Sequence, residues 1–264
     1  MLDATIVVRC GNDERVFRCL ESVDSPAEII VAFTGTKELS DRIAKTGARC
    51  VPAPPSNLSR VSNVGLDAAA TDCLILTDSD TVFESRCIER LVSALTTRKA
   101  ARASLRFEAG RGLSSIVAEA RDYVNHLPLL YTPGIALRRD ILPEIGGFFF
   151  NDPVPYAVDA DLNFRVQRAH VPVAFLPDAW VRHTDVPIRQ DLRAAHRIGI
   201  GCRVSMRYWN RNRGFGPVNR LTLKGVKPAH FPDLLRTKGP LVLGYQLVWD
   251  ASYWSGFFKQ PSHQ

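Results

Sequence analysis

The chain has 264 residues, of which 45% are hydrophobic and 23% are charged, and its formal net charge is +7. This length and composition can bury a real core, so they indicate a globular protein built as one large domain or two small lobes. No uncharged apolar segment reaches about 18 residues, and the N-terminus has neither a basic nor an apolar signal region, so neither membrane spanning nor secretion is expected. The six cysteines form no C-x-x-C pair, which argues against structural zinc and predicts a location in the reducing cytoplasm.

Apolar strand patterns alternate with helix patterns in the first part of the chain. Strands are expected at residues 4–9, 28–33 and 48–52. Helices are expected at residues 16–22, 37–46 and 58–70. This alternation predicts an α/β fold with a parallel sheet covered by helices. Because the chain lacks the glycine fingerprints of dinucleotide folds and P-loops, any bound phosphate is expected to be held through a metal ion.

The next strand, at residues 73–76, is apolar and ends abruptly in Asp78-Ser79-Asp80. Residues two apart in an extended segment point to the same side, so Asp78 and Asp80 can converge on one ligand or one cation. Open α/β sheets bind ligands at this edge. Carboxylate oxygens suit Mg²⁺ or Mn²⁺, which complete their coordination shells with substrate phosphates and water. The alternative for this motif is a solvated turn in which an aspartate caps the next helix.

The patterns after Asp80 are weaker. Helices are expected at residues 88–95 and 114–126, a strand at 171–176 and a short element at 179–183. The basic stretch at 98–111 has little pattern. Residues 129–137 and the glycine-aromatic run at 146–150 look more like the wall of a pocket than core strands. The alternative for 146–150 is a glycine turn ahead of a buried aromatic strand.

A second acidic cluster, Asp159 and Asp161, lies at the start of a predicted helix. Asp161 is expected to pair with Arg165 one turn later, which accounts for it structurally. Asp159 is left free near Tyr156, where a carboxylate can act as a general base, and capping of the helix is the alternative. His183 ends the short element at 179–183, either as a structural side chain or as a ligand for Mn²⁺.

Taken in this order, the motifs resemble those of the family 2 glycosyltransferases of the GT-A fold, over roughly residues 4–183. The matching segments are Ser62-Asn63-Val64-Gly65-Leu66, Asp78-Ser79-Asp80, Thr132-Pro133-Gly134, Ile145-Gly146-Gly147-Phe148, Asp159-Ala160-Asp161-Leu162 through Arg165, and His183. The resemblance implies an inverting, metal-dependent glycosyltransferase of the hexosyltransferase type. Such an enzyme moves a sugar from a nucleotide diphosphate sugar, most commonly a UDP-sugar, to an acceptor hydroxyl or amine, with Mn²⁺ or Mg²⁺ as the cofactor.

The resemblance also implies roles for individual residues. Asp159 would be the catalytic base, and Asp80 would hold the metal ion with His183 as a further ligand. Asp78 would contact the nucleoside of the donor. The residues expected to bind the nucleotide sugar are Asn12, Thr34, Asn63, Asp78, Ser79, Gly134 and Gly147.

The chain departs from the family pattern at several positions that recognise the base. Members usually carry Pro-Thr-[Tyr/Phe]-Asn after the first strand, where this chain has Arg9-Cys10-Gly11-Asn12. The second strand usually ends in Asp-Asp-Gly-Ser, where this chain has Ala32-Phe33-Thr34-Gly35. Ser62 stands in place of a common Arg, and Val158 in place of the usual Glu. The base of the donor nucleotide is therefore left open.

The expected architecture is a GT-A-like α/β domain at residues 1–186 with a basic, helical C-terminal extension at 187–264. The domain would consist of a nucleotide-binding half at 1–97 and an acceptor half at 98–186. Between residues 182 and 236 the chain has twelve Lys and Arg against three Asp. Such a patch can bind donor phosphates, an anionic acceptor or anionic lipid at the inner face of the membrane, and no nucleic-acid motif accompanies it.

The C-terminal stretch at 241–258 carries aromatic residues at near-helical spacing. It can pack on the catalytic domain, lie in a membrane interface or form a homodimer contact. The acceptor itself stays open among a small molecule, a saccharide and a lipid-linked saccharide. The alternative function is a non-catalytic GT-A-like scaffold that docks on a membrane or an anionic partner.

Overall fold

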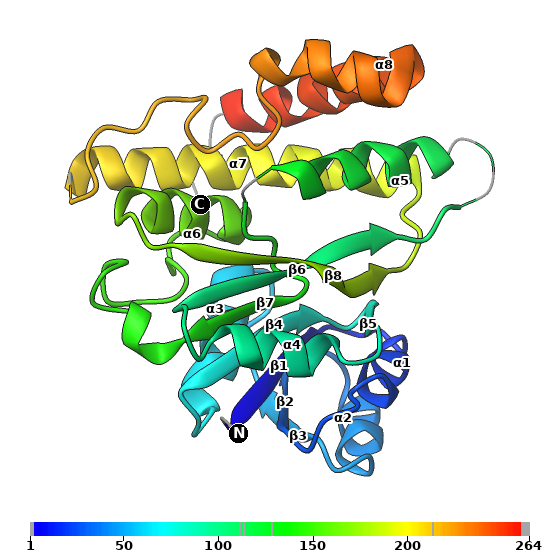
Figure 1. Ribbon diagram of the computed structural model, residues 1–264, viewed down its shortest axis with the longest axis vertical. Helices are drawn as coiled ribbons and strands as arrows, with labels where there is room; N and C mark the ends of the chain where they lie inside the picture. The colour runs from blue at the N-terminus through cyan, green and yellow to red at the C-terminus, as the bar shows by residue number, and fades with distance from the viewer. Residues whose placement is uncertain (1–2, 111, 113, 128, 213, 260–264) are drawn as a thin grey trace.

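The computed structural model describes residues 3–110, 112, 114–127, 129–212 and 214–259. Within these residues the strands form one eight-stranded sheet, in the order β3-β2-β1-β4-β7-β6-β8-β5, with helices packed on both faces (Figure 1). The strands are β1 (Ala4–Cys10), β2 (Glu28–Phe33), β3 (Arg49–Pro52), β4 (Cys73–Asp78), β5 (Thr81–Phe83), β6 (Ala100–Phe107), β7 (Ile135–Arg138) and β8 (Val173–His183). The helices are α1 (Val16–Glu21), α2 (Lys37–Ala44), α3 (Leu58–Ala68), α4 (Cys87–Ala94), α5 (Ser114–Tyr123), α6 (Val158–Arg168), α7 (Ile188–Asn212) and α8 (Phe231–Phe258). Short 3-10 helices occur at Val124–His126, Arg139–Ile141 and Pro228–His230.

The parallel part of the sheet consists of β1 to β4, as the alternation of strands and helices predicts. β1 pairs in parallel with β2 and β4, and β2 pairs in parallel with β3. Every residue of β1 is buried because its alternate side chains enter opposite cores. Ile6 and Val8 pack with α1, α2 and α4, whereas Val7 packs with α3. The strands and helices predicted for this half are confirmed, with ends that differ by one or two residues.

The stretch at 98–111, for which the sequence predicts no element, contains β6, a strand in the interior of the sheet. β6 pairs antiparallel with β7 and parallel with β8. Its apolar pattern is hidden by Arg102, which is nevertheless buried. The guanidinium of Arg102 lies 5.5 Å from the ring centre of Tyr131 and 4.2 Å from that of Phe175. Cation–π contacts with these two aromatic rings therefore stabilise the buried charge of Arg102.

The interpretation of residues 129–137 and 146–150 as a pocket wall is wrong for most of their side chains. β7 is a buried strand between β4 and β6. Phe149 and Phe150 are core residues on the face covered by α3 and α6. The two elements expected at 171–176 and 179–183 form one strand, β8, and its last residue, His183, pairs with Thr81 of β5.

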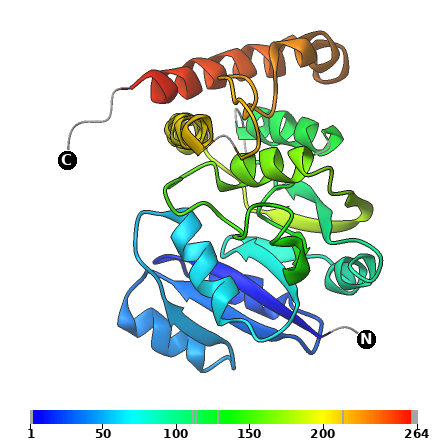
Figure 2. The same cartoon turned by 90° about the vertical axis from the view of Figure 1, so that its left-hand side faces the viewer.

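The C-terminal extension is helical, and its helices stack beyond α5 and α6 (Figures 1 and 2). α7 and α8 pack along each other, and α8 is kinked at Gly239, which has a φ of +84°, ahead of Pro240. The aromatic stripe of α8 is buried, which confirms packing among the three alternatives for this stretch. Its members are Tyr245, Trp249, Tyr253 and Phe257.

The expected boundary at residue 186 falls in the loop between β8 and α7. Among the described residues, no helix has both the length and the apolar character that a membrane span requires. All six cysteines are free thiols, and five of them are buried. Contact of the basic extension with a membrane surface stays a prediction.

Glycines set the distance between α7 and α8. A β-carbon on Gly256 would lie 1.9 Å from the backbone oxygen of His196, and one on Gly199 would lie 2.0 Å from that of Tyr253. We expect Gly256→Ala to lower the free energy of unfolding by about 1–3 kcal/mol, because backbone on both helices must shift. Chemical denaturation measures this loss.

Gly244 provides the matched control, since a β-carbon there meets no atom within 4 Å. Gly244→Ala should gain up to about 1 kcal/mol from helix propensity alone. Equal changes in the free energy of unfolding for the two variants would show that the close approach of α7 and α8 does not exclude a side chain at Gly256.

Candidate functional site

Asp78 ends β4 and is held by an arginine that the sequence reading did not assign to the site. Arg9 of β1 stands opposite Asp78 in the sheet, and its Nε and a terminal nitrogen donate to the two carboxylate oxygens at 2.7 and 2.8 Å. The same guanidinium donates to Thr132 Oγ1 at 2.9 Å and to Ser62 Oγ at 3.4 Å. Arg9 is only 7% exposed. The signal in the sequence that could have identified its role is a charged residue within an otherwise apolar strand. Arg9 joins β1, β4, α3 and the segment before β7.

Asp80 and His183 face each other across the pairing of β5 with β8. The Nε2 of His183 lies 3.4 Å from Asp80 Oδ1. Its Nδ1 lies 2.8 Å from the backbone oxygen of Thr184. Because a carbonyl only accepts, Nδ1 must carry a hydrogen, which in the neutral ring leaves the lone pair of Nε2 directed toward Asp80. Burial raises the pKa of Asp80 above its ordinary value, and the neighbouring His183 opposes this effect.

The Asp80 and His183 pair fits a divalent cation of the Mn²⁺ or Mg²⁺ type. A carboxylate oxygen and an imidazole nitrogen are both suitable donors, and the hydrogen bond from Nδ1 orients the ring as in metal sites. The described residues contain no group of three or more His, Cys, Asp or Glu that could hold a metal. A cation here would therefore need further ligands from a substrate, which is typical of sites that bind diphosphates. A guanidinium nitrogen of Arg15 also lies 3.5 Å from Asp80.

Three of the residues predicted to bind the nucleotide sugar lie with Asp78 at the carboxyl ends of β1, β2 and β4. Asn12 is exposed in the turn after β1. Thr34 follows β2 and donates its backbone N–H to Cys10. The hydroxyl of Ser79 donates to Asp13 at 3.1 Å. The structure thus brings these residues to one edge of the sheet, where open α/β sheets bind ligands.

The other three predicted residues have structural roles: Asn63 and Gly134 are engaged in packing, and Gly147 forms part of an exposed turn. The amide of Asn63 donates to the Phe150 oxygen and to Asp152, both at 2.8 Å, and so holds that loop. Gly134 is buried with a φ of +76°, and a β-carbon there would lie 2.6 Å from Val181. Gly147 is exposed in a turn with a φ of +87°. Each of the three has a structural reason for its residue type.

Asp161 is the structural member of the second acidic cluster, as the sequence predicts. Its Oδ2 accepts from Arg165 Nε at 2.9 Å, and the two side chains are 1% and 0% exposed. Its Oδ1 accepts from Ser205 Oγ at 2.5 Å and from Trp209 Nε1 at 2.7 Å, both on α7. All of its strong acceptor positions are therefore occupied inside the protein.

Asp159 occupies the first turn of α6, but it does not cap the helix. The cap position belongs to Ala157, in the left-handed conformation with a φ of +58°. Asp159 is half-buried, and its Oδ1 accepts only the backbone N–H of Ala160 at 3.0 Å among the hydrogen bonds of the described residues. Burial raises the pKa of Asp159, while the charge of Arg9 opposes the rise. The carboxylate is therefore placed to exchange a proton with a ligand.

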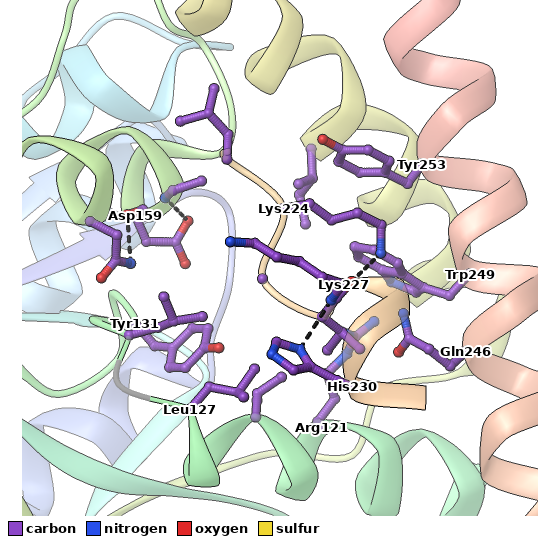
Figure 3. Close-up of a pocket in the computed structure, with 18 of the residues that line it drawn as sticks. Arg121, Leu127, Tyr131, Asp159, Lys224, Lys227, His230, Gln246, Trp249 and Tyr253 are labelled. Carbon is purple, nitrogen blue, oxygen red and sulfur yellow. Dashed lines mark hydrogen bonds between the residues drawn. The ribbon is translucent and has the colours of Figure 1, made fainter. Parts of the chain in front are cut away.

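Asp159 also lines a cavity of about 360 Å³ that the sequence did not reveal. Figure 3 shows Asp159 and Tyr131 on one wall, with Trp249 and Gln246 of α8 on the opposite side. Phe107 belongs to the same lining, and its ring stacks on that of His183 with centres 4.8 Å apart. The cavity therefore borders the candidate metal site through Phe107, and half of its wall comes from the C-terminal extension.

Comparison with known proteins identifies the fold. No protein-family model matches the chain, and no curated protein is similar to it in sequence. The mannosyltransferase PcManGT from Pyrobaculum calidifontis, solved with GDP-Man and Mn²⁺, has a TM-score of 0.60 at 16% identity over 97% of this chain and 76% of its own. S. aureus TarS in complex with UDP-GlcNAc has a TM-score of 0.55 at 14% identity over 97% of this chain and 90% of that chain.

A third solved structure, GalNAc-T7 with UDP, GalNAc and Mn²⁺, has a TM-score of 0.57 at 13% identity over 84% of this chain and 53% of its own. The chain spans about half, 55%, of a longer S. aureus TarS chain that it also matches. These likenesses show the GT-A glycosyltransferase fold, and the fold class predicted from the sequence is confirmed.

The two carboxylates of α6 should respond in opposite ways to loss of charge. Asp161→Asn should lower the free energy of unfolding by about 3–5 kcal/mol, because Arg165 is left as a buried, unpaired charge. Asp159→Asn should be neutral or stabilising at neutral pH, since a raised pKa means that the charged form disfavours folding. This benefit should vanish as the pH falls below the ordinary pKa of an aspartate, where Asp159 is protonated in both states.

Denaturation of both variants at several pH values measures these effects. Wild-type stability in Asp161→Asn, or a large loss in Asp159→Asn, would contradict the separate roles of the two residues.

Proposed function

We propose that this protein is an inverting glycosyltransferase that moves a sugar from a nucleotide diphosphate sugar to a hydroxyl or amine of an acceptor. The observation that carries the proposal is the placement of Asp80 with His183 at one end of a site and of Asp159 at the other. The charge of Asp78 raises the pKa of both Asp80 and Asp159, and the charge of Arg9 lowers that of Asp159, so the two ends belong to one electrostatic environment. The proposal is supported by the solved complexes of proteins with this fold, PcManGT with GDP-Man and Mn²⁺ and S. aureus TarS with UDP-GlcNAc.

The donor is expected to bind at the carboxyl ends of the parallel strands. Asp80 Oδ1 and the Nε2 of His183 would hold Mn²⁺ or Mg²⁺, which when bound stabilises the charge that develops on the diphosphate leaving group. Asp78 and its neighbours Asn12, Thr34 and Ser79 would contact the nucleoside, for which we propose uridine. Arg15 supplies a further positive charge beside Asp80 for the phosphates.

Asp159 is the proposed general base. Its carboxylate faces the cavity, and its raised pKa makes its ionised form a stronger base than an ordinary aspartate. The acceptor oxygen or nitrogen forms a bond to the anomeric carbon as its proton passes to Asp159. The bond from that carbon to the diphosphate breaks on the opposite side, and inversion follows from this in-line geometry.

Removal of the metal carboxylate should abolish the metal-dependent part of nucleotide binding. We expect UDP to raise the melting temperature of the wild type more with Mn²⁺ than without it, because a ligand that binds only the native state stabilises it. Asp80→Ala should lose this Mn²⁺-dependent increase and its turnover while it keeps its fold. Asp67→Ala, at an exposed position on α3, is the matched control and should behave as the wild type.

Two results would count against this part of the proposal: undiminished activity in excess EDTA, or an unchanged Mn²⁺ effect in Asp80→Ala. Failure of every nucleoside diphosphate to stabilise the wild type would favour the scaffold alternative.

Asp159→Asn removes basicity and keeps the size of the side chain. We expect kcat for release of UDP from the nucleotide sugar to fall at least about a hundredfold, with UDP binding nearly unchanged. The acid limb of the wild-type pH profile should lie above the ordinary pKa of an aspartate, since activity needs the ionised form and the pKa is raised. Turnover of Asp159→Asn close to that of an Asp67→Asn control would refute the assignment of the base.

A further inference from the structure

Most polar side chains around the 360 Å³ cavity are already paired within the protein. A guanidinium nitrogen of Arg121 lies 2.5 Å from Asp191, which also accepts from the hydroxyl of Tyr245. Asp250 in turn accepts from Lys224 and from Gln246, both at 2.7 Å. These groups satisfy one another, so they offer little to a ligand.

Two further lining groups are also used inside the protein. The amide nitrogen of Asn163 donates to the Leu130 oxygen at 2.7 Å, and its oxygen accepts the backbone N–H of the same residue at 2.6 Å. The Nδ1 of His230 accepts the backbone N–H of Lys227 at 3.1 Å. A ligand in the cavity would therefore find fewer free hydrogen-bonding groups than the number of polar residues in the lining suggests.

Three buried polar atoms of the lining have no hydrogen-bond partner among the described residues: the hydroxyls of Tyr131 and Tyr253, and Nε1 of Trp249. Trp249 is 8% exposed. Figure 3 shows the hydroxyl of Tyr131 directed into the cavity beside Asp159, and the side chain of Lys227 reaching across toward the same end. Buried polar atoms are normally paired, so unpaired ones in a cavity wall indicate a ligand.

Much of the remaining lining is aliphatic and aromatic. These residues include Leu105, Phe107, Val124, Leu127, Phe164 and Val226. A volume of about 360 Å³ lies within the range of roughly 300–1,000 Å³ found for small-molecule sites, which are mostly apolar with a few polar groups that orient the ligand. Asp159 and the hydroxyl of Tyr131 supply such polar groups at the end that carries the proposed base.

We propose that the acceptor is a small, largely apolar alcohol, aromatic or aliphatic, that binds in this cavity with its hydroxyl between Asp159 and Tyr131. This inference rests on the proposed function and names its acceptor class. The hydroxyl gives its proton to Asp159, and its oxygen forms the bond to the anomeric carbon. The diphosphate leaves with the electron pair of the broken bond, and Asp159 later releases the proton to solvent.

A saccharide acceptor does not suit the same cavity. It would bring several hydroxyls against a lining in which most side chains are apolar or already paired, and each unpaired buried hydroxyl costs about 1–3 kcal/mol. An apolar alcohol has only one hydroxyl that needs hydrogen-bond partners, and Asp159 and Tyr131 supply them. Phe107, which lines the cavity and stacks on His183, places the cavity next to the proposed diphosphate site.

Gly225 allows the cavity to be filled without strain. A β-carbon there would meet only Leu129 Cδ1 at 3.5 Å and the hydroxyl of Tyr131 at 3.9 Å. Gly225→Leu would therefore project into the ligand space. Gly244→Leu is the matched control, since its β-carbon meets nothing within 4 Å.

The experiment measures the binding of 2-naphthol, 1-octanol and maltotriose to the full chain by isothermal titration calorimetry. We expect both alcohols to bind the wild type and Gly244→Leu, and maltotriose to bind neither. Gly225→Leu should lose alcohol binding at least tenfold while UDP with Mn²⁺ still raises its melting temperature. Tyr131→Phe should weaken alcohol binding about three- to tenfold, as loss of one hydrogen bond predicts, with a melting temperature equal to or above that of the wild type.

The readouts separate this inference from the proposed function. Alcohol binding that is absent in the wild type, or unchanged in Gly225→Leu, overturns the acceptor class even if UDP and Mn²⁺ bind as expected. Binding of maltotriose that Gly225→Leu abolishes would assign the cavity to saccharides instead. Loss of nucleotide binding with intact alcohol binding would overturn the glycosyltransferase proposal and leave the cavity as an alcohol site.

Discussion

The buried ion pair of Asp161 with Arg165 fixes the arrangement of the site. The pair has almost no exposed surface, so it must be fully hydrogen-bonded to offset the cost of removing two charges from water. Asp161 meets this requirement with Ser205 and Trp209 of α7, and Arg165 meets it with the backbone oxygens of Ile145, Phe148 and Phe149. One pair therefore locks α6 to the C-terminal extension and to the glycine-aromatic loop. Since residues two apart on a helix face different ways, this lock turns Asp159 toward the cavity.

Charge balance at the carboxyl edge of the sheet depends on two arginines. The negative charges of Asp78 and Asp13 raise the pKa of Asp80, and like charges in a partly buried cluster are costly. Arg9 and Arg15 stand among them and offset that repulsion. Positive charge at the same edge also suits a substrate that carries phosphates. The arginines thus serve the fold and the electrostatics of the site together.

The sequence predicts the parallel half of the fold because there each strand is apolar along its length and each helix has one apolar face. It predicts the roles of Asp161 and Arg165 because their spacing on one helix suffices. β6 escapes prediction because Arg102 and several alanines blur its pattern. The buried guanidinium is explained by the rings of Tyr131 and Phe175 and by its hydrogen bond to the backbone oxygen of Asn125. The cavity escapes it because its walls come from segments more than 100 residues apart, whose meeting depends on packing that no local pattern encodes.

The packing of the C-terminal extension means that the proposed active site is not confined to residues 1–186. The boundary at residue 186 separates the sheet from α7. Residues on both sides of this boundary nevertheless surround Asp159, the proposed base. Asp159 faces a cavity whose opposite wall consists of Lys224, Gln246 and Trp249. Burial raises the pKa of Asp159, and residues of the extension complete the cavity that its carboxylate faces. The extension is therefore part of the proposed acceptor site, and the glycine contacts between α7 and α8 help to set the position of that wall.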